Sequence, residues 1–589
     1  MRSSWLALLL LAGCSRTELG LSFGIGTAYR SQVTTVDLRV VEPPVAEPFT
    51  CDDIAYANVD SDVVRLATVF EISGSAQDRI SIGEVDRVKP KLFWADGKDM
   101  SGTTLVTGCA EVGEITSSLT VEIAAEPIAV VAVSDPKPLI FQQGMTGATP
   151  SVSLIANDRL NNPIADVSAL WKVTGAGDMG SSSEAKAQPD GRIVIAPPAP
   201  PRPGPFVLAI RVRWASTPVI FISGAVTPSK ETIQLMGRAS TYVTGRIGPQ
   251  KEPGIAALVV VNGEDRVQIA YRSGGSFVYR TSDRLSSGSA LGMIDMHGNA
   301  PDRLIAVSAT DWNEIGSDGL LTRRAAYASP DILGIASPTG VYAAGDCAAT
   351  DAPLIAVSYD SPVVVGIFDA NGSRQRAHFL DNVGEDITAS GCVGSSDAHT
   401  LRTYVLGKGS IPLLTVAQTN GGSDYHAGGW IALSSGIGFS GGQSPLLLGT
   451  QINGNDLVIA RARLKLGMKM TADELVVDNL GTDGLPFPYQ PMVTAAGEID
   501  GDGKLDVVSL LAAAQQGMPD LHQLWAILGL ENDHRRVAGP MIPSISLADP
   551  TLIIGDLDGD NISDVIIGER PSSPATQSAV EIYRLGAMN

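Results

Sequence analysis

The stretch Gly497-Glu498-Ile499-Asp500-Gly501-Asp502-Gly503-Lys504-Leu505-Asp506-Val507-Val508 has a near copy at residues 555–566, which reads GDLDGDNISDVI. Both stretches carry acidic residues at the first, third, fifth and ninth positions after the opening glycine. These residues are Glu498, Asp500, Asp502 and Asp506 in the first loop and Asp556, Asp558, Asp560 and Asp564 in the second. Calcium prefers about six to eight oxygen ligands, so alternating carboxylates on a tightly turned backbone suit it. The seventh positions, Lys504 and Ile562, can each add a backbone carbonyl oxygen, and the sequence therefore predicts two calcium sites.

Two other kinds of loop share part of this spacing. An EF-hand loop needs a glutamate at its twelfth position and helices on both sides. The twelfth positions here are Ser509 and Ile567, and each loop leads into a strand-like apolar run. An EF-hand is therefore excluded. A pair of metal-free Asp-Gly hairpin turns is the remaining alternative, but it does not account for four acids at matching positions in both loops.

Short apolar runs that follow turns rich in Gly, Asp or Asn recur through the C-terminal part of the chain. These runs are Ala257–Val261, Leu304–Val307, Leu354–Val357, Thr403–Leu406, Leu457–Ala460, Val507–Leu511 and Val565–Ile567. Successive runs begin about 50 residues apart, a spacing that is typical of propeller blades. Seven such units over residues 233–589 predict a seven-bladed β-propeller. The turns at 295–299, 346–351 and 451–456 keep fewer acids and are expected to bind no metal.

The two acidic loops, together with the strands that follow them, resemble the FG-GAP (VCBS-type) repeat of integrin α chains and many bacterial surface proteins. Ile567-Gly568-Glu569-Arg570-Pro571 also loosely matches the Gly-x-Pro tail of that repeat. The resemblance implies a propeller in which calcium sits in a hairpin loop of the blade.

Two smaller β-domains are predicted before the propeller. Residues 33–126 contain strand-sized apolar runs that bracket two cysteines, which favours a β-sandwich with a disulfide. Residues 127–228 include LIANDRLNNPIADVSALW at 154–171, which resembles the bacterial immunoglobulin-like domains of surface proteins. The Pro-rich stretch 196–205 reads as an interdomain linker or as a long loop within this domain, and the strand-like run after it favours the loop. We therefore predict an all-β chain: two N-terminal β-sandwich (Ig-like) domains followed by a C-terminal seven-bladed β-propeller.

The N-terminus, residues 1–14, has the layout of a signal peptide. Its apolar run, Trp5–Ala12, is too short to span a bilayer, which takes about 20 residues. Leu11-Ala12-Gly13-Cys14 resembles the lipobox of bacterial lipoproteins, which implies that Cys14 is lipidated. Ser15 follows where inner-membrane lipoproteins usually carry aspartate, so the resemblance implies anchoring in the outer membrane, towards the periplasm or the cell surface. Residues 15–32 are then expected to form a tether.

The other four cysteines are expected to form disulfides, because an exported chain meets an oxidising compartment. Proximity in sequence favours the pairs Cys51–Cys109 and Cys347–Cys392 over the two other connectivities. No Cys-x-x-Cys is present, so no zinc or redox motif is predicted. Cys347 and Cys392 follow glycines in consecutive blades, so their disulfide is expected to clamp neighbouring blades.

Charge and motifs argue against several function classes. The formal net charge of −21 disfavours nucleic-acid binding, which calls for clustered Lys and Arg. Residues 438–442 match Gly-x-Ser-x-Gly, but they lie in a Gly/Ser-rich loop that leads to a strand, whereas a hydrolase elbow leads into a helix. The six histidines are scattered without the usual spacing of zinc ligands.

The sequence therefore favours a non-enzymatic, lipid-anchored protein of the cell envelope. Because propellers generally bind ligands through their loops, adhesion or recognition of an unidentified protein or glycan is the expected role. The alternative is a carbohydrate-active enzyme, a lyase or glycosidase, that uses the propeller as its catalytic domain. Such an enzyme would gather Tyr, His, Arg and acidic groups in one mouth of the propeller.

Overall fold

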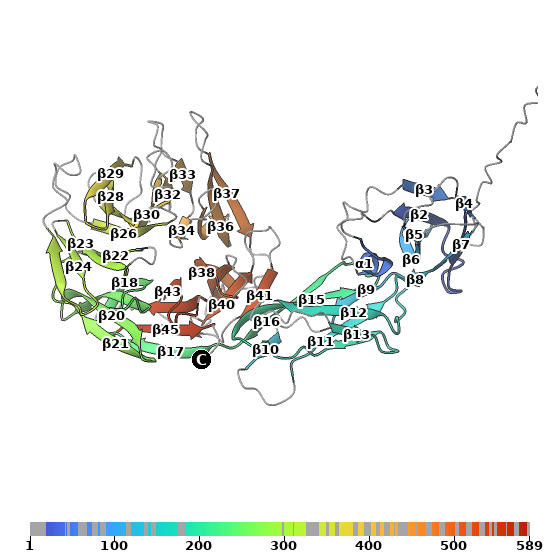
Figure 1. Ribbon diagram of the computed structural model, residues 1–589, viewed down its shortest axis with the longest axis horizontal. Coiled ribbons are helices and arrows are strands. Elements are labelled where there is room, and N and C mark those ends of the chain that lie inside the picture. Colours follow the sequence, from blue (N-terminus) through green and yellow to red (C-terminus); the bar gives the residue numbers. More distant parts are fainter. Residues whose placement is uncertain are drawn as a thin grey trace, which may run out of the picture.

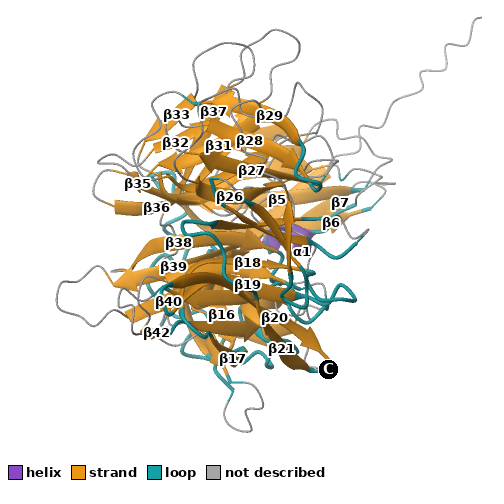
Figure 2. Ribbon diagram, turned by 90° about the vertical axis from the view of Figure 1, so that its left-hand side faces the viewer, coloured by secondary structure: helices purple, strands orange, loops and turns teal. Residues whose placement is uncertain are grey.

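The computed structural model is built of β-strands, with one short helix in its described part (Figures 1 and 2). Two smaller domains follow one another along the chain, and a ring of sheets forms the C-terminal part (Figure 1). The predicted all-β fold is confirmed. In the described part of the chain, no helix is long and apolar enough to cross a membrane. The structure describes residues 19–41, 43, 48–56, 68–72, 80–82, 90–113, 119–134, 139–142, 149–174, 183–296, 300–309, 311–324, 341–348, 353–359, 364–380, 387–393, 402–407, 413–416, 425–428, 430–433, 446–453, 456–465, 474–481, 489–500, 506–513, 521–528, 536–540, 545–546, 550–560, 562–570 and 577–585.

The first domain consists of two sheets, β4-β1-β7 and β3-β2-β5-β6-β8, which enclose one hydrophobic core. Its elements are β1 (Leu19–Gly24), β2 (Thr35–Val41), α1 (Cys51–Ala55), β3 (Thr68–Ile72), β4 (Ile80–Ile82), β5 (Lys91–Lys98), β6 (Thr104–Val112), β7 (Leu119–Ala124) and β8 (Glu126–Pro127). The disulfide Cys51–Cys109 fastens α1 to β6, and this predicted pairing is confirmed.

The prediction of a tether over residues 15–32 is wrong for the part of that segment that the structure describes. Strand β1 pairs in parallel with β7 over its whole length, so it belongs to the first domain. Leu21 and Phe23 are buried in that domain's core. The alternation of apolar residues with Gly and Ser over residues 19–25 is the strand signal, because one face of the strand must be apolar to cover the core.

The second domain also has two sheets around one core, in the orders β10-β16-β15-β12-β13 and β14-β11-β9. Its strands are β9 (Val130–Val133), β10 (Leu139–Phe141), β11 (Val152–Asn157), β12 (Ser168–Thr174), β13 (Ser183–Lys186), β14 (Arg192–Ile195), β15 (Gly204–Val212) and β16 (Ile220–Val226). The Pro-rich stretch 196–205 leaves β14 and enters β15, so it is a loop within the domain, as expected. The two-sheet arrangement fits the predicted sandwich, and its immunoglobulin-like kinship stays a prediction.

The propeller contains seven four-stranded blades in the described residues, so the predicted blade number is confirmed. Two of the blades, β26–β29 and β30–β33, join into one eight-stranded sheet because their innermost strands pair at Cys347 and Cys392. The strands of the first four blades along the chain are β18 (Arg238–Gly245), β19 (Gly254–Val261), β20 (Glu264–Ser273) and β21 (Ser276–Thr281); β22 (Ala290–Ile294), β23 (Arg303–Val307), β24 (Trp312–Ile315) and β25 (Leu321–Arg324); β26 (Val341–Ala348), β27 (Leu354–Tyr359), β28 (Val364–Asp369) and β29 (Arg374–Phe379); and β30 (Ile387–Val393), β31 (Arg402–Gly407), β32 (Leu413–Val416) and β33 (Tyr425–Gly428).

The last three blades lead back to the start of the ring. Their strands are β34 (Trp430–Leu433), β35 (Leu446–Asn453), β36 (Asp456–Lys465) and β37 (Glu474–Gly481); β38 (Tyr489–Gly497), β39 (Asp506–Ala513), β40 (Leu521–Leu528) and β41 (Arg536–Pro540), with β42 (Ile545–Ser546) beside β40; and β43 (Pro550–Gly555), β44 (Asp564–Glu569), β45 (Ala579–Arg584) and β17 (Ser229–Gln234). Strand β17 comes first in sequence but pairs with β45, so it closes the ring. The propeller therefore begins at Ser229, before the predicted start at residue 233. The last blade thus combines strands from both ends of the propeller sequence, and this pairing holds the two ends of the ring together.

Glycine recurs on innermost strands where one blade meets the next. A Cβ added to Gly245, Gly292, Gly345, Gly497 or Gly555 would lie 2.1, 2.7, 1.9, 2.3 or 2.9 Å, respectively, from an atom of the following blade. At Gly345 that atom is the backbone carbonyl oxygen of Ser390, which cannot rotate away. These glycines allow the blades to approach closely around the ring axis.

Replacing Gly345 with alanine should therefore destabilise the propeller, by about 2 to 3 kcal/mol, because the added methyl group overpacks a contact between two backbones. Chemical denaturation, monitored by tryptophan fluorescence, would measure the loss in free energy of unfolding. Gly113→Ala is the control, since a Cβ at that position meets no atom within 4 Å. Equal stability of the two variants would contradict the close-approach explanation.

Candidate metal centre

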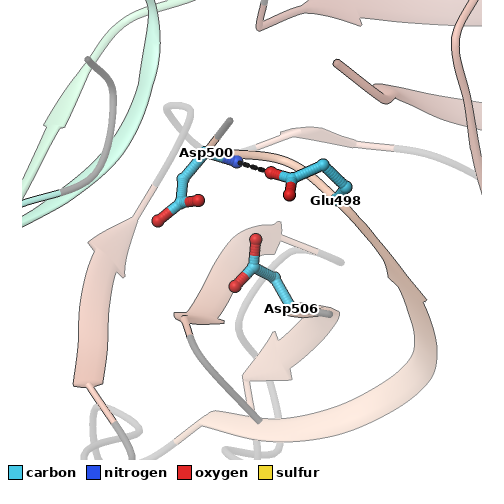
Figure 3. A group of neighbouring side chains, drawn as sticks. All are labelled: Glu498, Asp500 and Asp506. Atoms are coloured by element: carbon cyan, nitrogen blue, oxygen red, sulfur yellow. Dashed lines mark hydrogen bonds between the residues drawn. The ribbon is translucent and has the colours of Figure 1, made fainter. Parts of the chain in front are cut away.

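The first acidic loop joins β38 to β39, between the paired residues Gly497 and Asp506. Oxygen atoms of Glu498, Asp500 and Asp506 all lie within 4.8 Å of one another, and Figure 3 shows their carboxylates gathered around one point. Asp506 is fully buried and Asp500 is 6% exposed. The predicted ligands Asp502 and Lys504 lie outside the described residues.

The second acidic loop joins β43 to β44 and is closed in the same way, because Gly555 pairs with Asp564. Here the carboxylates of Asp556, Asp558 and Asp560 lie within 4.8 Å of one another. Asp564 is fully buried but does not belong to this group of three. The side chain of Ile562 is buried in the hydrophobic core between the two blades.

The two loops share one hydrogen-bond pattern. The ninth-position carboxylate accepts a hydrogen bond from the second-position amide: Ile499 N donates to Asp506 Oδ2, and Leu557 N to Asp564 Oδ2, both over 3.1 Å. The third-position amide donates to the first-position carboxylate, over 3.1 Å in the first loop and 3.2 Å in the second. Equivalent spacing in the sequence thus produces equivalent local structure, with a buried aspartate at the base of each turn.

Burial and the crowding of carboxylates raise the pKa values of two carboxyl groups in the second loop. Burial, followed by repulsion from Asp560 and Asp556, raises the pKa of the Asp558 carboxyl to about 6. Burial, followed by the charge of Asp558, raises the pKa of Asp564 to about 7. Both shifts have the sign expected where negative charge is disfavoured, and a bound cation would offset that cost.

An arginine approaches the second loop from the closing blade. The Arg584 guanidinium lies 3.4 Å from Asp558 Oδ2 and 2.5 Å from Glu231 Oε2 on β17. Its side chain is only 8% exposed. It therefore links the acidic loop to the strand that closes the ring.

A third turn of related construction is found in the blade β22–β25. Asp302 directly precedes β23, is 9% exposed, and accepts hydrogen bonds from the amides of Met296 (3.1 Å) and Arg246 (2.7 Å). Burial raises the pKa of its carboxyl above the ordinary value. The Arg246 guanidinium lies 3.6 Å from Asp295 and 4.0 Å from Asp302, so an arginine supplies positive charge at this turn. Asp302 is not among the predicted residues. Arg303 separates it from the apolar run Leu304–Val307, whereas Asp506 and Asp564 directly precede their runs.

The predicted residues outside the acidic loops are the cysteines of the propeller, Cys14 and the Gly-x-Ser-x-Gly stretch. The pair Cys347–Cys392 forms a disulfide that joins β26 to β30, so the predicted clamp between neighbouring blades is confirmed. Cys14 and the Gly-x-Ser-x-Gly stretch at 438–442 lie outside the described residues.

No protein-family model and no curated protein matches the sequence. Among solved structures, the chain is similar to BBS1N from its complex with ARL6DN, with 10% identity, a TM-score of 0.38, and coverage of 62% of this chain and 98% of that one. It is also similar to the six-bladed fucose lectin of Aleuria aurantia, with 14% identity, a TM-score of 0.29, and coverage of 53% and 98%. A third is a variant of the NanB sialidase of Streptococcus pneumoniae, with 12% identity, a TM-score of 0.24, and coverage of 93% and 94%. These TM-scores are low, so the fold assignment rests on strand order, and we draw no functional conclusion from the similarities.

Proposed function

We propose that this protein is a non-enzymatic, lipid-anchored protein of the cell envelope whose calcium-stabilised propeller recognises a protein or glycan ligand. The observation that carries the proposal is the pair of acidic loops with the same hydrogen-bond pattern, at equivalent turns of two neighbouring blades in a closed ring. The lipid anchor rests on the lipobox-like sequence that ends at Cys14. Mass spectrometry of the mature N-terminus tests it, with Cys14→Ser as the variant expected to remain unmodified.

The donor chemistry of both loops fits calcium. Carboxylate oxygens are hard ligands, which suit calcium better than the softer metals that histidine and cysteine bind. The proposed ligands on described residues are Glu498, Asp500 and Asp506 in the first loop and Asp556, Asp558 and Asp560 in the second. When bound, calcium would supply the positive charge that these crowded carboxylates call for. The protein's own contribution is to hold the oxygens together through the buried aspartate at the base of each turn.

The topology of the blades indicates where a ligand would bind. Successive turns of an antiparallel blade alternate between its two ends, and the acidic loops join first strands to second strands. The turns between second and third strands, and the connections from blade to blade, therefore open at the opposite end. The β19–β20 turn at Asn262-Gly263 and the connection 282–289 belong to that end. Because loops on a rigid scaffold are where recognition concentrates, we place the ligand there.

The experiment separates recognition from catalysis. The soluble chain, residues 15–589, is applied to a glycan array and incubated with envelope polysaccharides, with calcium and with EGTA. Calcium-dependent retention on the array, without new reducing ends or unsaturated products, is the expected result. Turnover of a polysaccharide would overturn the proposal in favour of a lyase or glycosidase.

A steric block identifies the face that binds. A polyethylene glycol chain is coupled to a cysteine introduced at Arg284, which is in the connection 282–289 and has a side chain that is 68% exposed. The control carries the same polymer at Asp318, in the exposed turn between the third and fourth strands of the next blade, at the end that bears the acidic loops. The polymer at residue 284 should abolish retention, whereas the polymer at residue 318 should not. The reverse result would move the ligand to the end of the acidic loops.

A further inference from the structure

The Pro-rich loop of the second domain reaches the first acidic loop of the propeller. Arg202 Nη2 donates a hydrogen bond to the backbone carbonyl oxygen of Asp500 over 2.7 Å, across 298 residues of sequence. At Gly204 the chain turns into β15 with φ +123°, a conformation that favours glycine. A Cβ at this position would lie 3.9 Å from the Ile499 carbonyl oxygen, so the two backbones are close neighbours. The contact therefore involves the acidic loop itself.

The apolar part of the same junction is also built from the acidic loops. Along β15, Phe206 and Leu208 face the core of their own domain, whereas Val207 points the other way and is fully buried in the propeller. Val207 belongs to the same buried cluster as Ile499, the second residue of the first loop, and Ile562, the seventh residue of the second. Strands β15 and β16 lie beside β41 at this place (Figure 1). The packing surface for the second domain thus depends on the conformation of both loops.

The two loops are tied to each other as well. The amide of Ser563 in the second loop donates to the carbonyl oxygen of Glu498 in the first, over 2.8 Å. A change in either loop is therefore expected to move the other, and with it the surface against which Val207 packs. Because packed interfaces of this kind have few alternative arrangements, a small shift in a loop changes the whole contact.

We infer that calcium in the acidic loops fixes the orientation of the second domain relative to the propeller. The inference rests on the calcium sites proposed above. Coordination would hold the Asp500 side chain and hence the peptide whose carbonyl oxygen accepts the Arg202 hydrogen bond. Removal of calcium leaves the carboxylates to repel one another, and the loops that form the junction loosen. The ion thus controls the direction in which the anchored chain presents its propeller.

The test measures orientation and calcium binding separately in the soluble chain, residues 15–589. Spin labels are attached at Val194→Cys in the second domain and Met236→Cys in the propeller, where the native side chains are 43% and 55% exposed. The four native cysteines are held in disulfides and do not react. Electron–electron double resonance then gives the distribution of distances between the labels, and calorimetric titration gives calcium binding in the same samples.

A narrow distance distribution with calcium and a broader or displaced one with EGTA is expected. Arg202→Ala should broaden the distribution in calcium while calcium binding persists. Its control is Arg159→Ala, an exposed arginine at the other end of the same domain, next to the Asp158 carboxylate that accepts a hydrogen bond from Tyr29 of the first domain. Calcium binding without any change in the distribution would overturn the inference alone. Failure of calcium to bind would overturn the proposed metal sites and the inference with them.

Discussion

Replacing Asp500 and Asp558 together with asparagine is expected to abolish the rise in melting temperature that calcium produces. A ligand that binds only the folded state stabilises it by about 2.7 kcal/mol per site at a hundredfold excess over Kd, so two sites give about 5 kcal/mol. Each substitution removes one carboxylate from a group whose oxygens lie within 4.8 Å of one another. Asparagine keeps the size of the side chain and one acceptor oxygen, and the loss is therefore one of charge. Calorimetric melting of the soluble chain with calcium and with EGTA measures it.

The same double variant should have the opposite effect without calcium. In EGTA the carboxylates of the second loop repel one another, and this repulsion, together with burial, raises the pKa of Asp558. Neutral amides remove the repulsion, so the variant should melt at a slightly higher temperature than the native chain in EGTA. Asp318→Asn is the matched control, because Asp318 sits in an Asp-Gly hairpin turn and accepts the amide of Leu320 over 3.0 Å. If calcium does not change the melting temperature of the native chain, the two loops are ordinary turns without a metal site.

The acidic loops could be located from sequence because their chemistry is local. Acids at alternate positions on a turning backbone must come close together, whatever surrounds the turn. Which acids of each loop come together in a cluster could not be predicted in the same way. Asp506 joins the acidic cluster of its loop, whereas Asp564 at the same position stays outside its own. Both aspartates accept the second-position amide of their loop, and Asp564 also accepts the amide of Leu585, which directly follows β45.

The blade number followed from repetition, but the pairings that close the structure did not. Six of the seven apolar runs lie on the second strand of a blade, while Leu457–Ala460 lies on β36, a third strand. This run still marks one blade, because each blade contains several strands of similar composition and one apolar run was assigned to each blade. Closure of the ring by β17 leaves no local signal, since pairing with β45 joins residues at opposite ends of the propeller sequence. The hydrogen bond between Arg202 and Asp500 is equally invisible in sequence, because an arginine in a Pro-rich loop has many possible partners.

Removal of the disulfide Cys347–Cys392 by paired substitution with alanine is expected to destabilise the propeller by about 4 kcal/mol, from the entropy of a loop of this length. The two cysteines are 45 residues apart and belong to the innermost strands of neighbouring blades. Both side chains are buried, so alanine avoids placing an unsatisfied hydroxyl group in the core. Hydrogen exchange of the strands β26–β33, and the melting transition that calcium shifts, measure the loss.

Comparison with the other disulfide makes this result specific. Cys51 and Cys109 are 58 residues apart, so their removal frees a loop of similar length, but in the first domain. Their double alanine variant should unfold the first domain more easily and leave the transition that calcium shifts in place. The Cys347→Ala/Cys392→Ala chain should retain its calcium response at a lower melting temperature, because the acidic loops belong to other blades. Equal effects of the two variants on the calcium-sensitive transition would mean that the clamp between β26 and β30 does not stabilise the ring, and that packing at the inner strands holds those blades together.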